Sequence, residues 1–337
     1  MRFSLFYNCG DFPGKEVSKL YREIEEQAIV ADRLGFDAIW LADQHFEAHS
    51  SMPSPLLYLA RISSFTRSIE LGVAVIEAPY YHPLRLAEDI ALLDILSGGR
   101  VRLGIGTGSI NTWQDFAHFD TSLDKKTARM LEMVAVLRQA FDEGCVDFLG
   151  NYYQYEGVEL LPRPFQPAQQ LIWIAANHAT PEIAGIAGYN LLIPNRGTAH
   201  ATRQFLDRYR AYLNGKPGFV AQLYFVSVVS CEREAQEQMR RILARYTHST
   251  DTFAWDGYSD SREYATLSRR LNLIIGTPSH VIEQLSVRQQ EYGINEIVCQ
   301  IYNAGMQHED ALRSITLLGE EVLPHLQQGY PLATVLE

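Results

Sequence analysis

Short apolar runs alternate with longer helical patterns along almost the whole chain, and this alternation is the feature that most limits the fold. Eight apolar runs are short enough to be buried strands: residues 3–7, 37–41, 69–76, 100–105, 171–175, 189–194, 221–229 and 296–301. Apolar positions at helical spacing predict helices between and after them: residues 16–34, 55–65, 84–95, 124–143 and 310–323. Strands that alternate with helices form parallel sheets, because each helix returns the chain to the same edge. We therefore predict one (β/α)8 barrel domain over residues 1–337, with a doubly wound open sheet as the alternative.

Two segments depart from this alternation. Residues 147–156 hold two short runs on either side of Gly150-Asn151, which predicts a β-hairpin inserted into the pattern. Residues 247–270 show no clear periodicity and include Trp255 and Tyr258. A long irregular segment inside a compact domain is a functional lid or a disordered stretch, and the aromatic side chains favour a lid.

Composition excludes several classes of protein. The chain has 29 Lys and Arg against 40 Asp and Glu, for a net charge of −11, which argues against a nucleic-acid-binding surface. A hydrophobic content of 47% excludes an intrinsically disordered chain. No apolar stretch reaches the roughly 18 residues of a membrane-spanning helix, and no secretion signal is evident. We expect a cytoplasmic protein that does not bind membranes.

The cysteines are far apart in the sequence and form no C-x-x-C pair: Cys9, Cys145, Cys231 and Cys299. This spacing argues against a disulfide framework and against a structural zinc site. Free thiols in a reducing compartment are the expectation.

Candidate active-site residues follow the strands, because a barrel carries its chemistry where strands end and the next loops begin. After the second strand, His45 and His49 stand four residues apart with Glu47 between them. Zinc pairs of this spacing lie on helices, whereas the serines and Pro53 that follow indicate a loop. We expect no metal, and His45 either binds a ligand, transfers a proton or serves the structure.

The loop after the third strand has a simpler interpretation. Pro83 suits the first turn of a helix, and His82 is expected to shape the loop. Arg85 is spaced to pair with Glu88 or Asp89, as surface charges on one helix face commonly do.

Glycines end the fourth strand in the sequence Gly104-Ile105-Gly106-Thr107-Gly108. The spacing does not match the dinucleotide-binding fingerprint, and no helix follows at once. Glycine at a strand end either lets a flat ligand approach the backbone or permits ordinary close packing. The sequence leaves both interpretations open.

After the fifth strand, Asn177, His178 and Thr180 precede a helix that begins near Pro181. Polar residues at a helix start form either a phosphate site or a plain N-terminal cap, and both need the same residues. Four aromatic residues in neighbouring segments suggest an apolar substrate pocket, although such side chains are also common in cores: Trp113, Phe116, Trp255 and Tyr258.

Taken together, these segments resemble the bacterial luciferase family of flavin-dependent monooxygenases. The matching motifs occur in the same order as in that family: residues 35–46, 82–89, 92–94, 97–100, 104–108, 276–278, 292–294 and 323–326. The resemblance implies a barrel that binds reduced FMN at the carboxyl ends of its strands, in a homodimer, with a separate flavin reductase supplying the flavin. Dioxygen would add at the flavin C4a position, and the resulting (hydro)peroxyflavin would oxygenate a small organic substrate. The protein would supply orientation, a dry pocket and proton control.

The resemblance also assigns roles to residues. His45 and Gln44 would lie in the catalytic loop, Ala74 and Val75 would underlie the flavin ring, and a non-proline cis peptide bond would join these two. Gly106, Thr107 and Gly108 would line the ring edge. The flavin phosphate would be bound by Asn177, His178 and Thr180.

Two departures from the family pattern qualify these roles. Light-emitting subunits have histidine where this chain has Gln44, so we expect no light emission. The family's phosphate-binding arginine is Thr107 here, which suggests weaker FMN affinity or a substitute cation such as Arg196. Two alternatives to an FMN monooxygenase stay open: an oxidoreductase that transfers hydride with the deazaflavin F420, and a non-catalytic luciferase-like partner subunit.

Overall fold

The computed structural model describes residues 1–10, 12, 14–46, 51–108, 113–119, 121–122, 124–195, 198–248, 269, 272–302 and 306–327. For residues 113–114 and 243–248 it describes the backbone without the side chains. Of the predicted residues, Arg196, Trp255, Tyr258 and most of the expected lid therefore lie outside the described part of the chain, as does the side chain of Trp113.

The sheet confirms the predicted barrel. Eight strands form it: β1 (Arg2–Tyr7), β2 (Ala38–Leu41), β3 (Glu70–Glu77), β4 (Val101–Gly106), β7 (Ile172–Ala175), β8 (Asn190–Ile193), β9 (Val220–Val228) and β11 (Glu296–Gln300). They are hydrogen-bonded in the order β9-β11-β1-β2-β3-β4-β7-β8, and a further pairing of β8 with β9 closes the sheet. The open-sheet alternative is wrong. Each of these strands begins and ends within one residue of its predicted limits. A buried strand of a parallel sheet is mainly apolar, so its ends can be recognised in the sequence.

The helices follow the predicted alternation: α1 (Val17–Leu34), α2 (Pro55–Ser63), α3 (Pro83–Ser97), α4 (Trp113–His118), α5 (Lys126–Arg138), α6 (Ala168–Leu171), α7 (Pro181–Ala187), α8 (Ala199–Tyr212), α9 (Glu232–His248), α11 (Pro278–Tyr292), α12 (His308–Leu317) and α13 (Leu323–Gln327). Proline begins four of them, where its missing N–H is no loss, and Gly35 ends α1 with a left-handed backbone. A single 3-10 turn, Ala78–Tyr80, follows β3. No described helix is long and apolar enough to cross a membrane.

Several elements differ from the sequence prediction. The helices expected over 124–143 and 310–323 each pass into a π-helical turn, at Gln139–Glu143 and Leu318–Val322. Helix α9 and the short strand β10 (Leu273–Gly276) were not predicted. Strand β10 has only four residues and pairs with the carboxyl-terminal part of β9, where Leu273 lies opposite Phe225.

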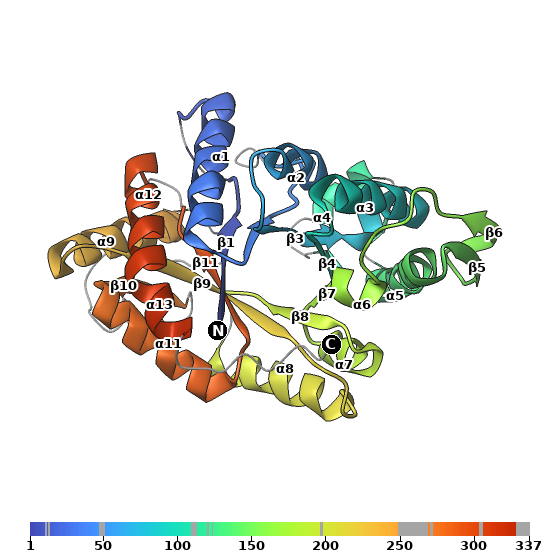
Figure 1. Ribbon diagram of the computed structural model, residues 1–337. Coiled ribbons are helices and arrows are strands. Elements are labelled where there is room, and N and C mark those ends of the chain that lie inside the picture. The colour runs from blue at the N-terminus through green and yellow to red at the C-terminus, as the bar shows by residue number, and fades with distance from the viewer. Residues whose placement is uncertain are drawn as a thin grey trace. The chain divides into compact units, whose positions relative to one another are not determined.

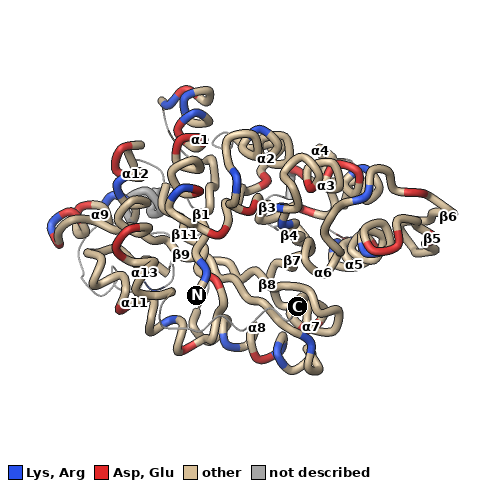
Figure 2. Tube along the Cα trace, in the orientation of Figure 1, with Lys and Arg blue, Asp and Glu red and all other residues tan. Residues whose placement is uncertain are grey.

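The chain divides into two compact units. The first comprises Met1–Ile39, Ile193–Gln204 and Val220–Glu337, and the second comprises Trp40–Leu192 and Phe205–Phe219. Within the first unit, α1 and α12 pack together beside β1 and β11 (Figure 1). Charged residues are frequent along helices such as α1, α9 and α12 (Figure 2).

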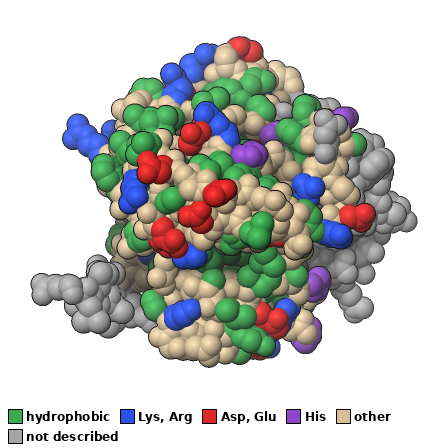
Figure 3. Space-filling model, turned by 90° about the vertical axis from the view of Figure 1, so that its right-hand side faces the viewer, with side chains coloured by type: hydrophobic (Ala, Val, Ile, Leu, Met, Phe, Trp, Pro, Cys, Tyr) green, Lys and Arg blue, Asp and Glu red, His purple; other side chains and the backbone are tan. Residues whose placement is uncertain are grey.

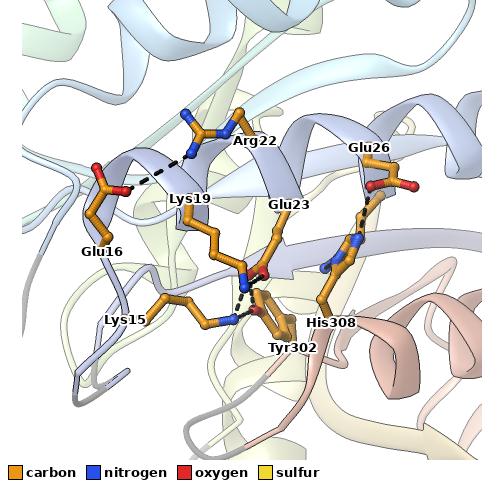
Figure 4. A network of polar contacts seen from close by, with 9 residues as sticks. Lys15, Glu16, Lys19, Arg22, Glu23, Glu26, Tyr302 and His308 are labelled. Carbon is orange, nitrogen blue, oxygen red and sulfur yellow. Dashed lines mark hydrogen bonds and ion pairs between the residues drawn. The ribbon is translucent and has the colours of Figure 1, made fainter.

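A polar network in the first unit joins the start of α1 to the segment after β11 (Figure 4). The Lys15 ammonium contacts both the Glu23 carboxylate and the Tyr302 hydroxyl, and this hydroxyl donates to the same carboxylate. Nearby, Nε2 of His308 lies 2.9 Å from the carboxylate of Glu26. Burial alone raises the pKa of Glu23, but its contacts with Lys15 and Tyr302 outweigh burial, so the net pKa is lowered.

In the second unit, a buried cation stabilises the core. The guanidinium carbon of Arg102 lies 5.5 Å from the ring centre of Trp40 and 5.0 Å from that of Trp173, and Arg102 pairs with Glu70. On the neighbouring strand, a Cβ added to Gly72 would lie 2.2 Å from the ring of Trp40. Residue 72 must therefore be glycine for this indole to occupy its place.

The predicted hairpin is present as β5 (Cys145–Leu149) and β6 (Gln154–Glu159), which pair in antiparallel fashion. The carboxylate of Glu132 on α5 accepts hydrogen bonds from three backbone N–H groups of the hairpin turn, at Asn151, Tyr152 and Tyr153. The hairpin is thus attached to α5 by charge-assisted hydrogen bonds. On the face that carries the hairpin, hydrophobic side chains are interspersed with acidic and basic ones (Figure 3).

The substitution Gly72→Ala is expected to lower the free energy of unfolding by about 1–3 kcal/mol, because the new methyl group overpacks against Trp40. Urea unfolding measures this loss. In the double variant with Trp40→Phe the loss should be smaller than the sum of the single losses, since the smaller ring leaves room. Strictly additive losses would show that the contact is not the cause.

The substitution Tyr302→Phe is expected to cost about 1 kcal/mol near neutral pH, because Glu23 loses a hydrogen-bond donor. A lowered folded-state pKa stabilises the protein above the unfolded value of 4.5, and this contribution is lost as the pH falls through the folded-state pKa. Unfolding curves of the two proteins should therefore converge in acid. Glu16→Gln, which removes the exposed pair of Glu16 with Arg22, is the control and should change nothing measurable.

Candidate functional site

Strand β3 carries one extra residue relative to β4, at the centre of the candidate site. Val73 lies opposite Leu103 and Ile76 lies opposite Ile105, so three steps on β3 match two on β4. The extra residue falls at Ala74 and Val75, whose peptide bond is cis, as the family resemblance led us to expect. Ala74 and Val75 are half-buried, whereas Val73 and Ile76 are fully buried. A bulge re-aims side chains, and here it leaves a small apolar platform accessible.

The glycines of β4 make room for this bulge. A Cβ at Gly104 would lie 3.0 Å from the Val75 side chain, and one at Gly106 would lie 2.6 Å from it. Gly106 therefore packs closely against Val75, where a larger side chain would not fit. Gly108 has a φ of +83°, and a Cβ there would lie 2.6 Å from the Phe116 ring.

Three polar side chains form a chain of contacts beyond the ends of β2 and β3, which we call the His45 relay: Tyr81, Asp43 and His45. The Tyr81 hydroxyl donates to Oδ2 of Asp43 at 2.9 Å, and Oδ1 of Asp43 lies 3.1 Å from Nε2 of His45. The Asp43 side chain is completely buried and that of His45 is 10% exposed. Tyr81 was not singled out from the sequence, because its contact with Asp43 spans 38 residues.

The surroundings of His45 favour its charged form. Burial by itself lowers the pKa of His45, but the adjacent Asp43 carboxylate raises it, and Glu77 and Asp115 add negative charge. The net pKa lies above the ordinary value of 6.5. Burial and the charge of Asp43 both raise the pKa of Tyr81, so its phenol stays protonated and keeps donating. His45 can therefore exchange a proton near neutral pH.

Aromatic rings from three segments pack around His45. The ring centres of Phe119 and Tyr80 lie 4.8 Å and 5.7 Å from that of His45. Phe46 lies 6.0 Å away, and the predicted Phe116 packs edge-on against Tyr80 at 5.0 Å. Phe116 is 2% exposed, so it belongs to the packed cluster. The cluster gives His45 an apolar environment, and the sequence had indicated only Phe116 of its members.

The polar residues expected to receive a phosphate lie together at the ends of β4 and β7. The amide of Asn177 donates to the hydroxyl of Thr107 at 3.4 Å. The Thr180 hydroxyl accepts from the backbone N–H of Asn177 at 3.0 Å and donates to the carbonyl of Ala175 at 2.6 Å. Asn177 and Thr180 therefore also shape this loop. His178 is exposed, and its carbonyl accepts a hydrogen bond from Arg208.

Two cations near these strand ends were not foreseen. Arg208 pairs with Glu182 at 2.9 Å, and Nζ of Lys126 donates to the carbonyl of Gly108 at 2.7 Å.

The backbone N–H of Gln44, the other predicted catalytic residue, donates to the carbonyl of Met52. His49 lies outside the described residues, among which no group of three His, Cys, Asp or Glu side chains could hold a metal ion.

Several motif residues serve the structure instead. The buried Asp94 carboxylate accepts hydrogen bonds from the backbone of Phe165 and Gln166, and Arg100 donates to the carbonyls of Ser63, Thr66, Ile69 and Ser97. His82 precedes α3 and contacts Tyr155, and Arg85 pairs with Asp89 at 2.7 Å. The structural interpretations of His82 and Arg85 are thereby supported.

The chain as a whole is similar to proteins of one family. The model of the family described as luciferase-like monooxygenase matches residues 1–296. The oxygenase component of the flavin-dependent trigonelline monooxygenase of Acinetobacter baylyi is 26% identical, over 98% of this chain and 96% of that protein.

Solved structures show the same fold. The monooxygenase RslO1 of Streptomyces bottropensis has a TM-score of 0.87 and 24% identity, covering 97% of this chain and all of that chain. The oxygenating constituent of 3,6-diketocamphane monooxygenase of Pseudomonas putida, in complex with FMN, has a TM-score of 0.79 and 17% identity, over 96% and 98% of the two chains. The F420-dependent tetrahydromethanopterin reductase of Methanopyrus kandleri has a TM-score of 0.73 and 20% identity, over 96% and 99%.

The substitution Asp43→Asn is expected to lower the pKa of His45, because the nearest negative charge is removed. NMR titration of the imidazole resonances measures this change. Asp115→Asn should give a smaller decrease in the same direction, and Asp89→Asn, which removes a carboxylate paired with Arg85, should give none. An unchanged pKa in Asp43→Asn would contradict the charge pairing.

The same pair makes stability depend on pH. Because the folded-state pKa of His45 is raised, the pairing stabilises the fold fully below the unfolded value of 6.5. This contribution is lost as the pH rises through the folded-state pKa. The difference in unfolding free energy between wild type and Asp43→Asn should therefore be largest in mild acid.

Proposed function

The chain belongs to the luciferase-like monooxygenase family, and from this premise we propose that it is the oxygenating component of a two-component flavin-dependent monooxygenase. It would use reduced FMN and dioxygen to oxygenate a small organic substrate within a single barrel domain. The observation that carries this proposal is the His45 relay, a proton-exchanging group with a buried carboxylate partner beside the β3–β4 platform.

The platform and the relay are linked through Glu77. This residue ends β3, two positions after Val75, and its charge acts on His45. A flat cofactor seated against Ala74 and Val75 would thus lie next to the imidazole. The half-buried apolar platform and the polar Thr107–Asn177 pair fit a cofactor that has a flat ring at one end and a phosphate at the other.

When bound, reduced FMN supplies the two electrons that activate dioxygen, so that one oxygen atom reaches the substrate and the other leaves as water. The chain's own residues would then hold the flavin, exclude water and control one proton. Ala74 and Val75 support the ring, and the aromatic cluster around His45 keeps water away from the reacting atoms. His45 gives or takes the proton at Nδ1, the ring nitrogen that does not face Asp43, while Asp43 at Nε2 and Tyr81 behind it fix the orientation of the imidazole.

Partners follow from the same proposal. A two-component enzyme needs a flavin reductase, and the trigonelline relative is itself named an oxygenase component. We also propose a homodimer, since Leu57 on α2 and Leu92 and Leu96 on the adjoining α3 are between 49% and 75% exposed. Exposed apolar side chains that gather on neighbouring helices mark interaction surfaces. The described cysteines are free, which suits the reducing cytoplasm.

The alternatives lead to different expectations. F420-dependent proteins share this fold, and an F420 enzyme would transfer hydride without dioxygen. A non-catalytic partner subunit has no need of a buried relay, so the intact Tyr81–Asp43–His45 contacts favour an active enzyme. Because light-emitting subunits have histidine where this chain has Gln44, we propose a monooxygenase that does not emit light.

Anaerobic titration with reduced FMN and, separately, with reduced F420 tests the cofactor. Tight binding of FMN, followed on mixing with oxygenated buffer by reoxidation slower than that of free flavin, is the expected result. Binding of F420 alone would favour hydride transfer. Binding of neither would favour the non-catalytic subunit.

The role of His45 is tested by the pH dependence of this reoxidation. In the wild type we expect a rate that changes with a midpoint above 6.5, because the pKa of His45 is raised. His45→Gln should abolish this dependence and slow proton-coupled steps by about 10²-fold or more, while FMN binding stays within about twofold. His82→Gln is the matched control and should behave as wild type. Unchanged kinetics in His45→Gln would remove His45 from the mechanism.

A further inference from the structure

Lys126 is a cation near the candidate site that has no part in the proposed oxygenation. It is the first residue of α5, is half-buried, and donates from Nζ to the carbonyl oxygen of Gly108 at 2.7 Å. Within the described part of the chain, Lys126 forms no ion pair with a carboxylate. A Cβ added to Gly108 would lie 3.3 Å from Oε2 of Glu77.

A half-buried ammonium whose protein partner is one carbonyl oxygen is an incomplete arrangement. Withdrawing a charge from water is costly unless an opposite charge or several hydrogen bonds replace the lost water. An ammonium has three N–H donors, and the Gly108 carbonyl takes one of them. Among the residues that the structure describes, the other two donors have no hydrogen-bond partner, which leaves them open to an anion.

The position of Lys126 indicates which anion this is. Gly108 directly follows Thr107, and the hydroxyl of Thr107 accepts from the Asn177 amide. The ammonium is therefore held one residue from the polar pair that joins the ends of β4 and β7. Three segments of one unit thus converge here: the end of β4, the end of β7 and the start of α5.

The other cation near these strand ends is already engaged. Nε of Arg208 pairs with Glu182 at 2.9 Å, and its Nη1 donates to the carbonyl of His178. Its charge is thus balanced by a carboxylate, and its role is to hold the loop after β7. No carboxylate of the described residues pairs with Lys126 in this way.

We propose that Lys126 binds the phosphate group of the flavin, in place of the arginine that the family has where this chain has Thr107. The inference rests on the proposed FMN-dependent function and specifies the residue that distinguishes FMN from riboflavin, which lacks the phosphate. Lysine binds phosphate as a point charge, so affinity for FMN should depend on ionic strength.

Anaerobic equilibrium dialysis with reduced FMN and with reduced riboflavin tests this role in three variants. Lys126→Met should weaken FMN binding roughly tenfold and leave riboflavin binding unchanged, because riboflavin offers no phosphate. Lys126→Arg should keep most of the preference for FMN. Lys125→Met removes the same charge one residue earlier, from an exposed side chain, and should change neither affinity more than about twofold.

The other outcomes separate this inference from the proposed function. Equal weakening of both flavins in Lys126→Met would mean that Lys126 only supports the Gly108 segment, and would overturn the inference. Unchanged FMN binding in that variant would overturn it as well, with the proposed function intact. A wild-type protein that binds neither flavin would overturn the inference together with the FMN-dependent function.

Discussion

The close approach of β3 to β4 is the constraint on which the candidate site depends. Gly104 and Gly106 carry no side chain, and the space they leave is taken by the Val73 carbonyl oxygen at Gly104 and by the Val75 side chain at Gly106. This space admits the extra residue of β3, which turns Ala74 and Val75 out of the core and carries Glu77 into register with Gly106. A side chain at either glycine would push the two strands apart and close the platform.

The His45 relay shows how burial and charge combine to set one proton affinity. Burial disfavours the charged imidazole, yet three carboxylates act in the opposite direction and prevail. The nearest of them, Asp43, is itself fully buried and is held by the Tyr81 hydroxyl. A group with such partners is oriented and kept ready to exchange a proton, which is what an oxygen-activating site needs from its protein.

Some of the residues that make the family recognisable serve the fold. Asp94 and Arg100 belong to the most recognisable motifs, and both satisfy backbone groups where α3 turns into β4. Such buried hydrogen bonds cannot be replaced by water, so these positions constrain the fold. Lys126, which we propose as the phosphate-binding cation, lies outside every motif, because a flexible side chain can reach such a site from more than one element.

Local patterns in the sequence determined the elements of the barrel. The eight strands are short, mainly apolar runs, and the hairpin at Gly150-Asn151 is signalled by its turn residues. Strand β10 and helix α9 were not predicted, because the strand is short and the helix is polar, so neither shows a strong apolar pattern. The loop after β2 and His45 were also found from the sequence, since strand ends follow from the strands themselves.

Tertiary structure alone decided which of these residues act together. How closely Gly106 packs against Val75, whether Tyr81 reaches Asp43, and which rings surround His45 all depend on contacts between residues tens of positions apart. A sequence pattern reports the periodicity of one element, whereas the direction of a side chain across neighbouring elements depends on strand register, and here on one extra residue in β3. The sequence by itself therefore determined the barrel and its family, and the packing of β3 against β4 decided the shape of the site.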